Sequence, residues 1–390
     1  MNNTVSLKYL NDYSFTELEN AVKDSFLKLN IQKLFKPKMK VMLKVCLPYN
    51  ISPDLAETTH PALVQAIISV LSGMGVACLV ADSPIKNFNQ QKMDSLYITT
   101  GMLGVANSTK GELNYNYNVV KVSTPNGKKT KSLTLIDAIN DVDLIINVAK
   151  LKVDERFGYK GAAHNLFGLI PGEVKEQVLN RLTTLADYNN YLLDVYQALK
   201  KKIVLNVVDA IVAIEAGQSQ RMLSCLGIAE NPFSLDAAML NIINVPIENS
   251  IVKQASERNL VELANPYKLV DEDIKSFKID DFAVYEFSST NKLHKNSAER
   301  KRYFKHNQQR TVINSDVCKG CSVCSKICPT GAIVMKYDKN NELYASIDYQ
   351  KCIFCNKCYA ACPYKVVKLK TPNGYKKLER KLSAGQGEKE

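Results

Sequence analysis

The sequence predicts an α/β domain with a layered, mostly parallel sheet, followed by a small cysteine-rich α+β domain. Two observations favour this fold class. Short apolar runs typical of buried strands alternate with stretches of helical periodicity up to about residue 245, a pattern that places helices on the faces of a parallel sheet. Two regular cysteine runs follow near the end of the chain, which at 390 residues is long enough for two or three domains.

The first elements form a strand–helix–strand unit. Residues 15–29 carry apolar side chains at helical spacing, and residues 41–47 form a short apolar run typical of a buried strand. A helix is predicted over residues 61–71, because it begins at a proline and is followed by Gly73. A second apolar run, residues 76–80, comes next. The two strands are therefore expected to be parallel and joined by a right-handed crossover.

The middle of the chain continues this alternation after a polar stretch. Residues 87–132 show no strong element, and residues 143–148 form another apolar run. A glycine-rich loop follows at residues 158–172, and loops after the strands of α/β folds are where ligands bind. The remaining predicted elements are a helix at 176–199, a strand at 203–208, a helix at 234–243 and a short strand at 282–285.

The two cysteine runs share the spacing C-x2-C-x2-C-x3-C-P. The first run is Cys318, Cys321, Cys324 and Cys328 before Pro329, and the second repeats it at an offset of 34 residues as Cys352, Cys355, Cys358 and Cys362 before Pro363. In runs of this spacing three cysteines hold one 4Fe-4S cube and the fourth holds the other. The spacing therefore predicts two 4Fe-4S clusters, the first bound by Cys318, Cys321, Cys324 and Cys362 and the second by Cys352, Cys355, Cys358 and Cys328.

Structural zinc and disulfides are the alternative interpretations of these cysteines. Zinc sites usually have two cysteines, a long gap and two further ligands, a pattern that four cysteines in eleven residues do not match. The first residues lack the basic start and apolar core of a signal peptide. A β-hairpin is predicted between the runs, over residues 332–347. The whole segment 311–368 resembles the two-cluster bacterial-type ferredoxin module.

Composition limits the environment and the partners of the chain. It is 46% hydrophobic and 23% charged, and no apolar run approaches the roughly 18 residues of a membrane helix. We expect a cytoplasmic protein of an oxygen-poor compartment, without a membrane span. The formal charge is +12, and two clusters with their thiolates lower it by about four. Basic residues concentrate at 292–310 and 365–381.

These two basic stretches have two interpretations. They are either a solvated linker and tail, or a surface that steers an acidic redox partner protein or an anionic substrate, since such fields raise encounter rates. Specific nucleic-acid binding is not expected, because no recognised binding motif accompanies the charge. The chain also has neither a G-x-G-x-x-G fingerprint nor a P-loop, so the usual support for nucleotide binding is missing.

Candidate reactive residues lie at the predicted strand ends, which converge on one crevice in an open parallel sheet. The proposed catalytic residues are His60, Lys150, Lys152, His164 and Asp209, and further candidates are Lys44, Cys46, Asp82 and Glu215. Among them His60 would act as a base or a ligand, Lys150 and Lys152 would hold an anionic group, and Asp209 would orient a histidine or bind a metal. The structural alternatives are a helix cap for His60 and a solvated side chain for Lys152.

The α/β part resembles the domain of unknown function 362 family over about residues 38–245. The resemblance is carried by residues 58–61, 82–84, 147–152, 164–168 and 171–172 and by Lys175. It implies an α/β domain joined to a two-cluster ferredoxin module. The sequence departs from the family pattern at Lys44-Val45-Cys46, at Lys152-Val153-Asp154, at His164 and at residues 216–220. Either the substrate differs, or this copy keeps the scaffold without the catalysis.

The predicted domains are a helical lead-in at 1–37, the α/β domain at 38–287, a basic linker at 288–310, the ferredoxin-like domain at 311–368 and a basic tail at 369–390. The first functional hypothesis is an oxidoreductase-like protein whose two clusters relay electrons to or from a site in the α/β domain. The second is an electron carrier or assembly partner whose α/β domain docks another protein. The third is a non-redox enzyme whose clusters serve structure or sensing.

Overall fold

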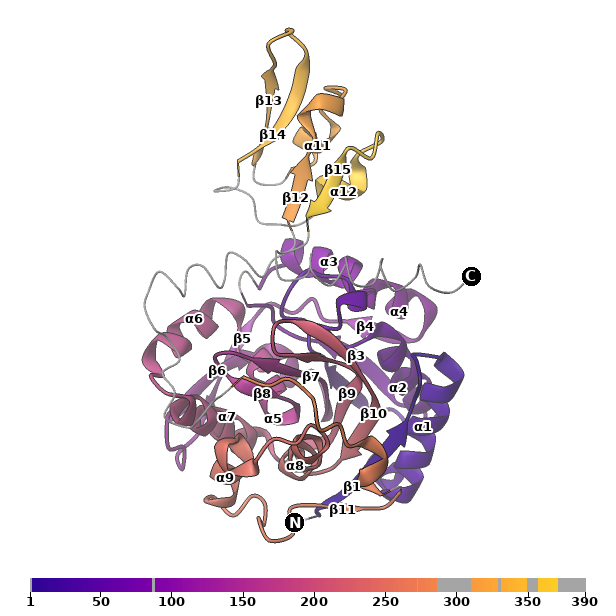
Figure 1. Ribbon diagram of the computed structural model, residues 1–390, viewed down its shortest axis with the longest axis vertical. Helices are drawn as coiled ribbons and strands as arrows, with labels where there is room; N and C mark the ends of the chain where they lie inside the picture. Colours follow the sequence, from indigo (N-terminus) through magenta and orange to yellow (C-terminus); the bar gives the residue numbers. More distant parts are fainter. Residues whose placement is uncertain are drawn as a thin grey trace.

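The computed structural model describes residues 2–85, 88–271, 273–285, 310–328, 331–348 and 357–370. Figure 1 shows a large α/β unit and a small C-terminal unit. The predicted basic linker and tail lie outside the described residues, except for Arg310, Leu369 and Lys370. The predicted α/β architecture with a ferredoxin-like region after it is confirmed.

A nine-stranded sheet forms the centre of the large unit, with the order β11-β1-β10-β9-β7-β2-β3-β4 and β8 paired to β7. The neighbours from β9 to β4 are parallel, and β1, β8 and β10 add antiparallel pairs. The strands are β1 (Thr4–Tyr9), β2 (Lys40–Lys44), β3 (Ala77–Ala81), β4 (Gly111–Leu113), β7 (Leu144–Asp154), β8 (Gly158–Lys160), β9 (Ile203–Glu215), β10 (Ser219–Ala229) and β11 (Lys268–Leu269).

Two groups of helices cover this sheet (Figure 1). Helix α1 (Phe15–Lys28) packs on α2 (Pro61–Gly73), near α3 (Gln90–Thr99) and α4 (Met102–Ser108). The second group is α5 (Ala162–Asn165), α6 (Gly172–Arg181), α7 (Leu185–Leu199), α8 (Pro232–Ile242) and α9 (Ile251–Ser256). Within the part of the chain that the structure describes, no helix combines the length and apolar character needed to cross a bilayer.

Helix α2 shows how the local sequence sets an element. Its N-cap is His60, whose Nδ1 accepts a hydrogen bond from the N–H of Ala62, and Pro61 occupies the first turn, where its missing N–H has no intrahelical role. The apolar face of the helix, which includes Leu63 and Ile67, is fully buried. Gly75, with a φ of +75°, turns the chain into β3. The helix therefore connects β2 and β3 as parallel neighbours, and the carboxyl ends of both strands lie at the same edge of the sheet.

The structure differs from the sequence-based expectation in several regions. The helix expected over 176–199 is divided into α6 and α7, and residues 282–285, expected to be a strand, form none. The first 37 residues are not only helical, because β1 pairs with β10 within the central sheet; its alternation of Val5 and Leu7 with polar residues is typical of a strand buried on one face. The stretch 87–132, for which no strong element was expected, holds α3, α4, β4 and β5 (Val119–Ser123), the last paired with β6 (Ser132–Ile136). The predicted domain boundaries stay a prediction.

The small unit repeats one motif of strand, helix and strand. The first copy is β12 (Arg310–Ile313), α11 (Val323–Lys326) and β13 (Ile333–Tyr337), and the second is β14 (Leu343–Ile347), α12 (Lys357–Ala361) and β15 (Val367–Lys370). The first strand of each copy pairs with the last strand of the other, as β12 with β15 and β13 with β14. The hairpin predicted over 332–347 is formed by β13 and β14, and it is thus one of the two strand pairs that join the copies.

Candidate functional site

The cysteines of the small unit surround its apolar core. Cys318, Cys324, Cys328, Cys358 and Cys362 pack around Ile333, Ala345 and Val367, whereas Cys321 is exposed. Cys352 and Cys355 lie outside the described residues. Cys324 and Cys358, which the repeat relates to each other, occupy equivalent helices that contact one another. Thiols from both runs therefore meet at one core, as the predicted exchange of fourth ligands requires.

The surroundings of the Cys362 thiol favour the thiolate form that a cluster ligand requires. Burial raises the pKa of the Cys362 thiol, but the backbone N–H groups of residues 364–367 together lower it below its usual value. The pKa of Cys324 is raised to about 11, mainly by burial and also by nearby thiols; a cationic iron core would remove that repulsion. Among the described residues no three His, Cys, Asp or Glu side chains are placed to share one metal ion.

A cavity of about 90 Å³ lies at the ends of β2 and β3 and beside β7. A water molecule needs about 15 Å³ by this measure, so the cavity holds a molecule of only a few non-hydrogen atoms. Its lining includes the aromatic side chains of Phe157, Phe167 and Tyr188. The charged lining residues are one carboxylate, Asp82, and six cationic side chains, namely Lys44, Lys150, Lys152, Arg156, Lys160 and Lys175.

Lys44 and Asp82 form a buried ion pair among these charged lining residues. The Lys44 Nζ donates to Asp82 Oδ1 at 2.8 Å and to Asn165 Oδ1 at 3.1 Å. The amide of Asn165 in turn donates to Asn147 Oδ1 at 2.9 Å, and the amide of Asn147 donates to Asn206 Oδ1 at 2.9 Å. This network ties the ends of β2 and β3 to α5 and to the neighbouring strands β7 and β9, so much of the motif shared with the family has a structural role.

Lys150 and Lys152 face the same side of β7 because they are two residues apart. The Lys150 Nζ lies 2.9 Å from Asp209 Oδ1 and donates to the Tyr13 hydroxyl at 2.7 Å. Burial lowers the pKa of Lys150, although Asp209 opposes this change. The Lys152 Nζ donates to Glu57 through its backbone oxygen at 2.7 Å and through Oε2 at 2.9 Å.

The pKa of Lys152 is raised, in contrast to that of Lys150. Burial lowers it, but Cys46 and Glu57 raise it by more. Cys46 lines the same cavity as Lys150, Lys152 and Lys175 and also raises the pKa of Lys150 and of Lys175. An ammonium group that stays charged beside a small thiol is suited to hold an anion.

His164 and Lys160 also line the cavity. The His164 ring is half-buried, and its Nδ1 lies 3.3 Å from the Tyr188 hydroxyl. Burial, and then the neighbouring Lys160, lower the pKa of His164 well below its usual value, so the imidazole is neutral at pH 7. Lys160 pairs with Asp154 at 2.7 Å. His164 therefore contributes a neutral imidazole that can form hydrogen bonds, and Lys160 contributes an ammonium group that is paired with a carboxylate.

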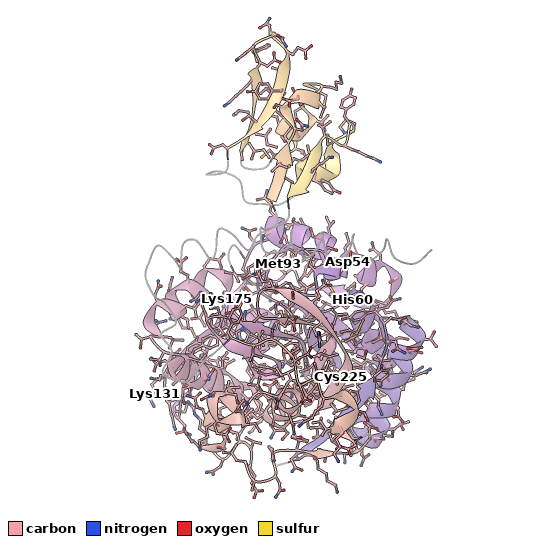
Figure 2. All side chains as sticks on the ribbon, in the orientation of Figure 1. Asp54, His60, Met93, Lys131, Lys175 and Cys225 are labelled. Carbon is pink, nitrogen blue, oxygen red and sulfur yellow. The ribbon has the colours of Figure 1, made fainter. Side chains whose placement is uncertain are left out.

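The structure brings together most of the residues that the sequence indicated. Lys44, Cys46, Asp82, Lys150, Lys152 and His164 line the cavity. His60 does not line it, because its ring caps α2 and stacks on Tyr13 with centroids 3.7 Å apart. Asp209 lies behind Lys150 and also accepts from the backbone N–H of His60. Figure 2 labels His60 and Lys175 at separate positions in the large unit.

Two further sequence candidates have other positions in the structure. Glu215 accepts a hydrogen bond from the backbone N–H of Ala283 and does not line the cavity. Sequence reasoning named Lys175 only as part of the family resemblance and missed Arg156, Phe157 and Tyr188. Arg156 and Phe157 follow directly after β7, and that position was the available signal. Tyr188 comes from α7, and its place at the cavity depends on helix packing alone.

Comparisons with known proteins give two family matches. Residues 41–241 match the family model described as "Domain of unknown function (DUF362)", and residues 317–373 match the model described as "4Fe-4S dicluster domain". A search of the curated proteins gave no match.

One similar solved structure is the lactate racemase apoprotein from Thermoanaerobacterium thermosaccharolyticum, which is 16% identical to this chain with a TM-score of 0.34. The alignment covers 57% of this chain and 53% of that one, so the chain spans about half the length of that protein. A similarity of this size does not extend to the site or the activity.

Proposed function

The chain belongs to the DUF362 family and ends in a 4Fe-4S dicluster domain, and from this premise we propose an oxidoreductase-like function. Two 4Fe-4S clusters in the small unit relay electrons to or from a small anionic molecule bound in the cavity of the α/β unit. The cluster ligands are the eight cysteines of the two runs, of which Cys318, Cys321, Cys324, Cys328, Cys358 and Cys362 are described. The clusters would supply one-electron chemistry.

The charge of the cavity wall is the observation that carries the substrate class. Four of its lysines are paired with carboxylates at 2.7–2.9 Å, as Lys44 with Asp82, Lys150 with Asp209, Lys152 with Glu57 and Lys160 with Asp154. Among the described residues no carboxylate forms an ion pair with Lys175, and the lining residues themselves include six cationic side chains and one carboxylate. This composition favours an anion in a poorly solvated site.

The experiment measures electron transfer into the cavity. Protein purified without oxygen is analysed for iron, sulfide and zinc, reduced with dithionite and freed of excess reductant. Nitrite, sulfite, glyoxylate and pyruvate are then added separately, and the return of the visible cluster absorbance is followed. These probes are anions small enough for the cavity. We expect about eight iron atoms per chain and reoxidation by at least one of the anions.

A charge-neutral cavity variant makes the test specific. Lys152→Gln keeps a hydrogen-bond donor for Glu57 and removes the ammonium, so it should slow reoxidation about tenfold or more, because a hydrogen bond to a charged group contributes about 1.5–3 kcal/mol. Lys200→Gln, at an exposed position after α7, is the matched control and should behave as the wild type. Zinc with little iron would overturn the cluster assignment. Equal reoxidation rates in both variants would reject the cavity and favour the carrier role.

A further inference from the structure

Lys175 differs from the other lysines of the cavity in what holds its nitrogen. Its side chain is buried on α6, and Nζ donates to the backbone oxygens of Ser83 and Pro84, the latter at 3.0 Å. Among the described residues no carboxylate forms an ion pair with it, whereas Lys44, Lys150, Lys152 and Lys160 each have one. Two neutral carbonyl oxygens therefore accept the hydrogen bonds of Lys175, whereas each of the other lysines is paired with a carboxylate.

This arrangement is compatible with both protonation states of the nitrogen. An ammonium group has three N–H bonds and a neutral amine has two N–H bonds and a lone pair. The two carbonyls take two N–H bonds in either state, so loss of a proton leaves neither carbonyl without its donor. The remaining tetrahedral position presents an N–H bond or a lone pair, and Lys175 contributes to the cavity lining. For a lysine that is paired with a carboxylate, by contrast, loss of a proton removes the charge that the carboxylate binds.

We propose that Lys175 is the proton donor and acceptor for a substrate bound in the cavity, an inference that rests on the proposed function of the site. In the donor direction the Nζ–H bond breaks, a bond forms between that proton and a basic atom of the substrate, and the electron pair stays on nitrogen. No electron moves at Lys175, and solvent returns the proton between turnovers. Reduction of a small anion generates such a basic atom, which is where a positioned acid contributes to the rate.

The charged groups around Lys175 are compatible with this role. The pKa of Lys175 is lowered to about 7, and burial is the main cause. Asp82 raises this pKa, and Lys44 lowers it. Cys46, from the loop after β2, and Glu173, on the same helix, raise it by smaller amounts. Glu173 is itself fixed by the backbone N–H of Phe88 at 2.7 Å. The nitrogen thus exchanges its proton near neutral pH, where a general acid or base is most effective.

The first test needs no substrate and uses the full-length protein labelled with 13C at the lysine ε-carbon. The signal that disappears in Lys175→Arg identifies Lys175, and its chemical shift is followed from pH 5 to pH 11. We expect a midpoint near pH 7 for Lys175, well below the usual lysine value of about 10.4. A Lys175 signal that remains in the ammonium form through pH 9 would overturn the proposal, whatever the clusters do.

The second test uses the anion that reoxidises the clusters. Lys175→Arg keeps the charge and the donors for Ser83 and Pro84 but does not release a proton, so it should slow reoxidation by about 10²- to 10⁴-fold and remove the pH dependence near 7. Lys200→Arg, at an exposed position outside the cavity, is the control and should keep that dependence. An unchanged pH profile in Lys175→Arg with intact iron content would reject the assignment. A titration near pH 7 without reoxidation by any of the anions would reject the relay and, with it, the role of Lys175 in that reaction.

Discussion

Lys44 and Asp82 form an ion pair in the interior, with Nζ 2.8 Å from Oδ1 and both side chains almost fully buried. The backbone of Gly168 passes so close to this pair that a Cβ atom there would overlap both charged atoms. The absence of a side chain at position 168 is thus explained by close contact with Lys44 and Asp82. The pair, Asn165 and Gly168 together fix α5 and the following turn over the ends of β2 and β3.

Gly168→Ala should therefore destabilise the large unit. Insertion of a methyl group into a packed interior costs about 1–3 kcal/mol, and displacement of one charge from a buried pair adds to that. Urea unfolding followed by far-ultraviolet circular dichroism measures the effect. Gly104→Ala is the control, because a Cβ at Gly104 in α4 meets open space; it should be neutral or stabilise by about 0.5–1 kcal/mol. Equal midpoints for the two variants would contradict the packing argument.

The cysteine spacing and the alternation of strands and helices could be read from the sequence because both are local. The spacing of Lys150 and Lys152 likewise indicates that they share a face of β7. Helix α3 escaped prediction because its residues are mainly polar and even Lys92 is buried in it. Its first turn is set by the side chain of Asn89, which accepts from the N–H of Lys92.

The division of the strand-end residues into lining and supporting groups depends on sheet register. Lys150 of β7 and Asp209 of β9 are opposite each other in parallel strands, and this pairing turns Asp209 into the partner of a lysine instead of a cavity group. The His60 side chain does not reach the cavity, because it caps α2 and stacks on the ring of Tyr13. Neither relationship follows from the local sequence, since strand order and register are set by contacts between distant segments.

The assignment of fourth ligands across the two cysteine runs predicts how pairs of substitutions combine. Cys324→Ala should remove one cluster and lower the iron content from about eight to about four per chain. Adding Cys362→Ala should remove little more, because both residues are assigned to the same cluster. Adding Cys328→Ala instead should remove the second cluster as well. Iron and sulfide analysis after anaerobic purification measures this.

Cys78→Ala is the matched control for these cysteine variants. Cys78 is buried on β3 in the large unit, so its loss should leave the iron content unchanged. The outcome that contradicts the crossed assignment is a Cys324/Cys328 double variant that retains about four iron atoms while the Cys324/Cys362 double variant loses all of them. In that case each run would hold its own cluster.

Cys46 gives a chemical probe of the charge in the cavity. This half-buried cysteine lines the same cavity as Lys150, Lys152 and Lys175, so an anionic alkylating reagent should be favoured there over a neutral one. The ratio of iodoacetate to iodoacetamide labelling at Cys46, measured by peptide mass spectrometry, should exceed the ratio for glutathione by a few fold. It should fall at high salt if the cavity is open to ions.

Lys152→Gln should bring the Cys46 labelling ratio toward that of glutathione, whereas Lys200→Gln should leave it unchanged. A ratio that is the same in the wild type and in Lys152→Gln would show that this ammonium does not act on molecules in the cavity. The measurement is independent of the clusters, so it separates the anion preference of the site from its role in electron transfer.

Asp236 of α8 makes stability depend on pH in an acidic window. Its carboxylate accepts hydrogen bonds from the Tyr159 hydroxyl and from the N–H groups of Ala162 and Ala163, which begin α5. Burial raises the pKa of Asp236 to about 6, although these hydrogen bonds oppose the rise. The folded carboxyl therefore keeps its proton between about pH 4 and pH 6, where the unfolded chain has released it.

Because the folded state binds more protons in that window, stability falls as the pH rises from about 4 to 6. The loss due to Asp236 is about 3 kcal/mol by pH 7, at 1.36 kcal/mol for each unit of pKa difference. Asp236→Asn removes this titration, so the difference in unfolding free energy between wild type and variant should shift by this amount in favour of the variant between pH 4 and pH 7. Urea unfolding at both pH values measures it. A difference that stays constant across the window would mean that Asp236 ionises near its usual pKa and holds α5 as an ordinary carboxylate.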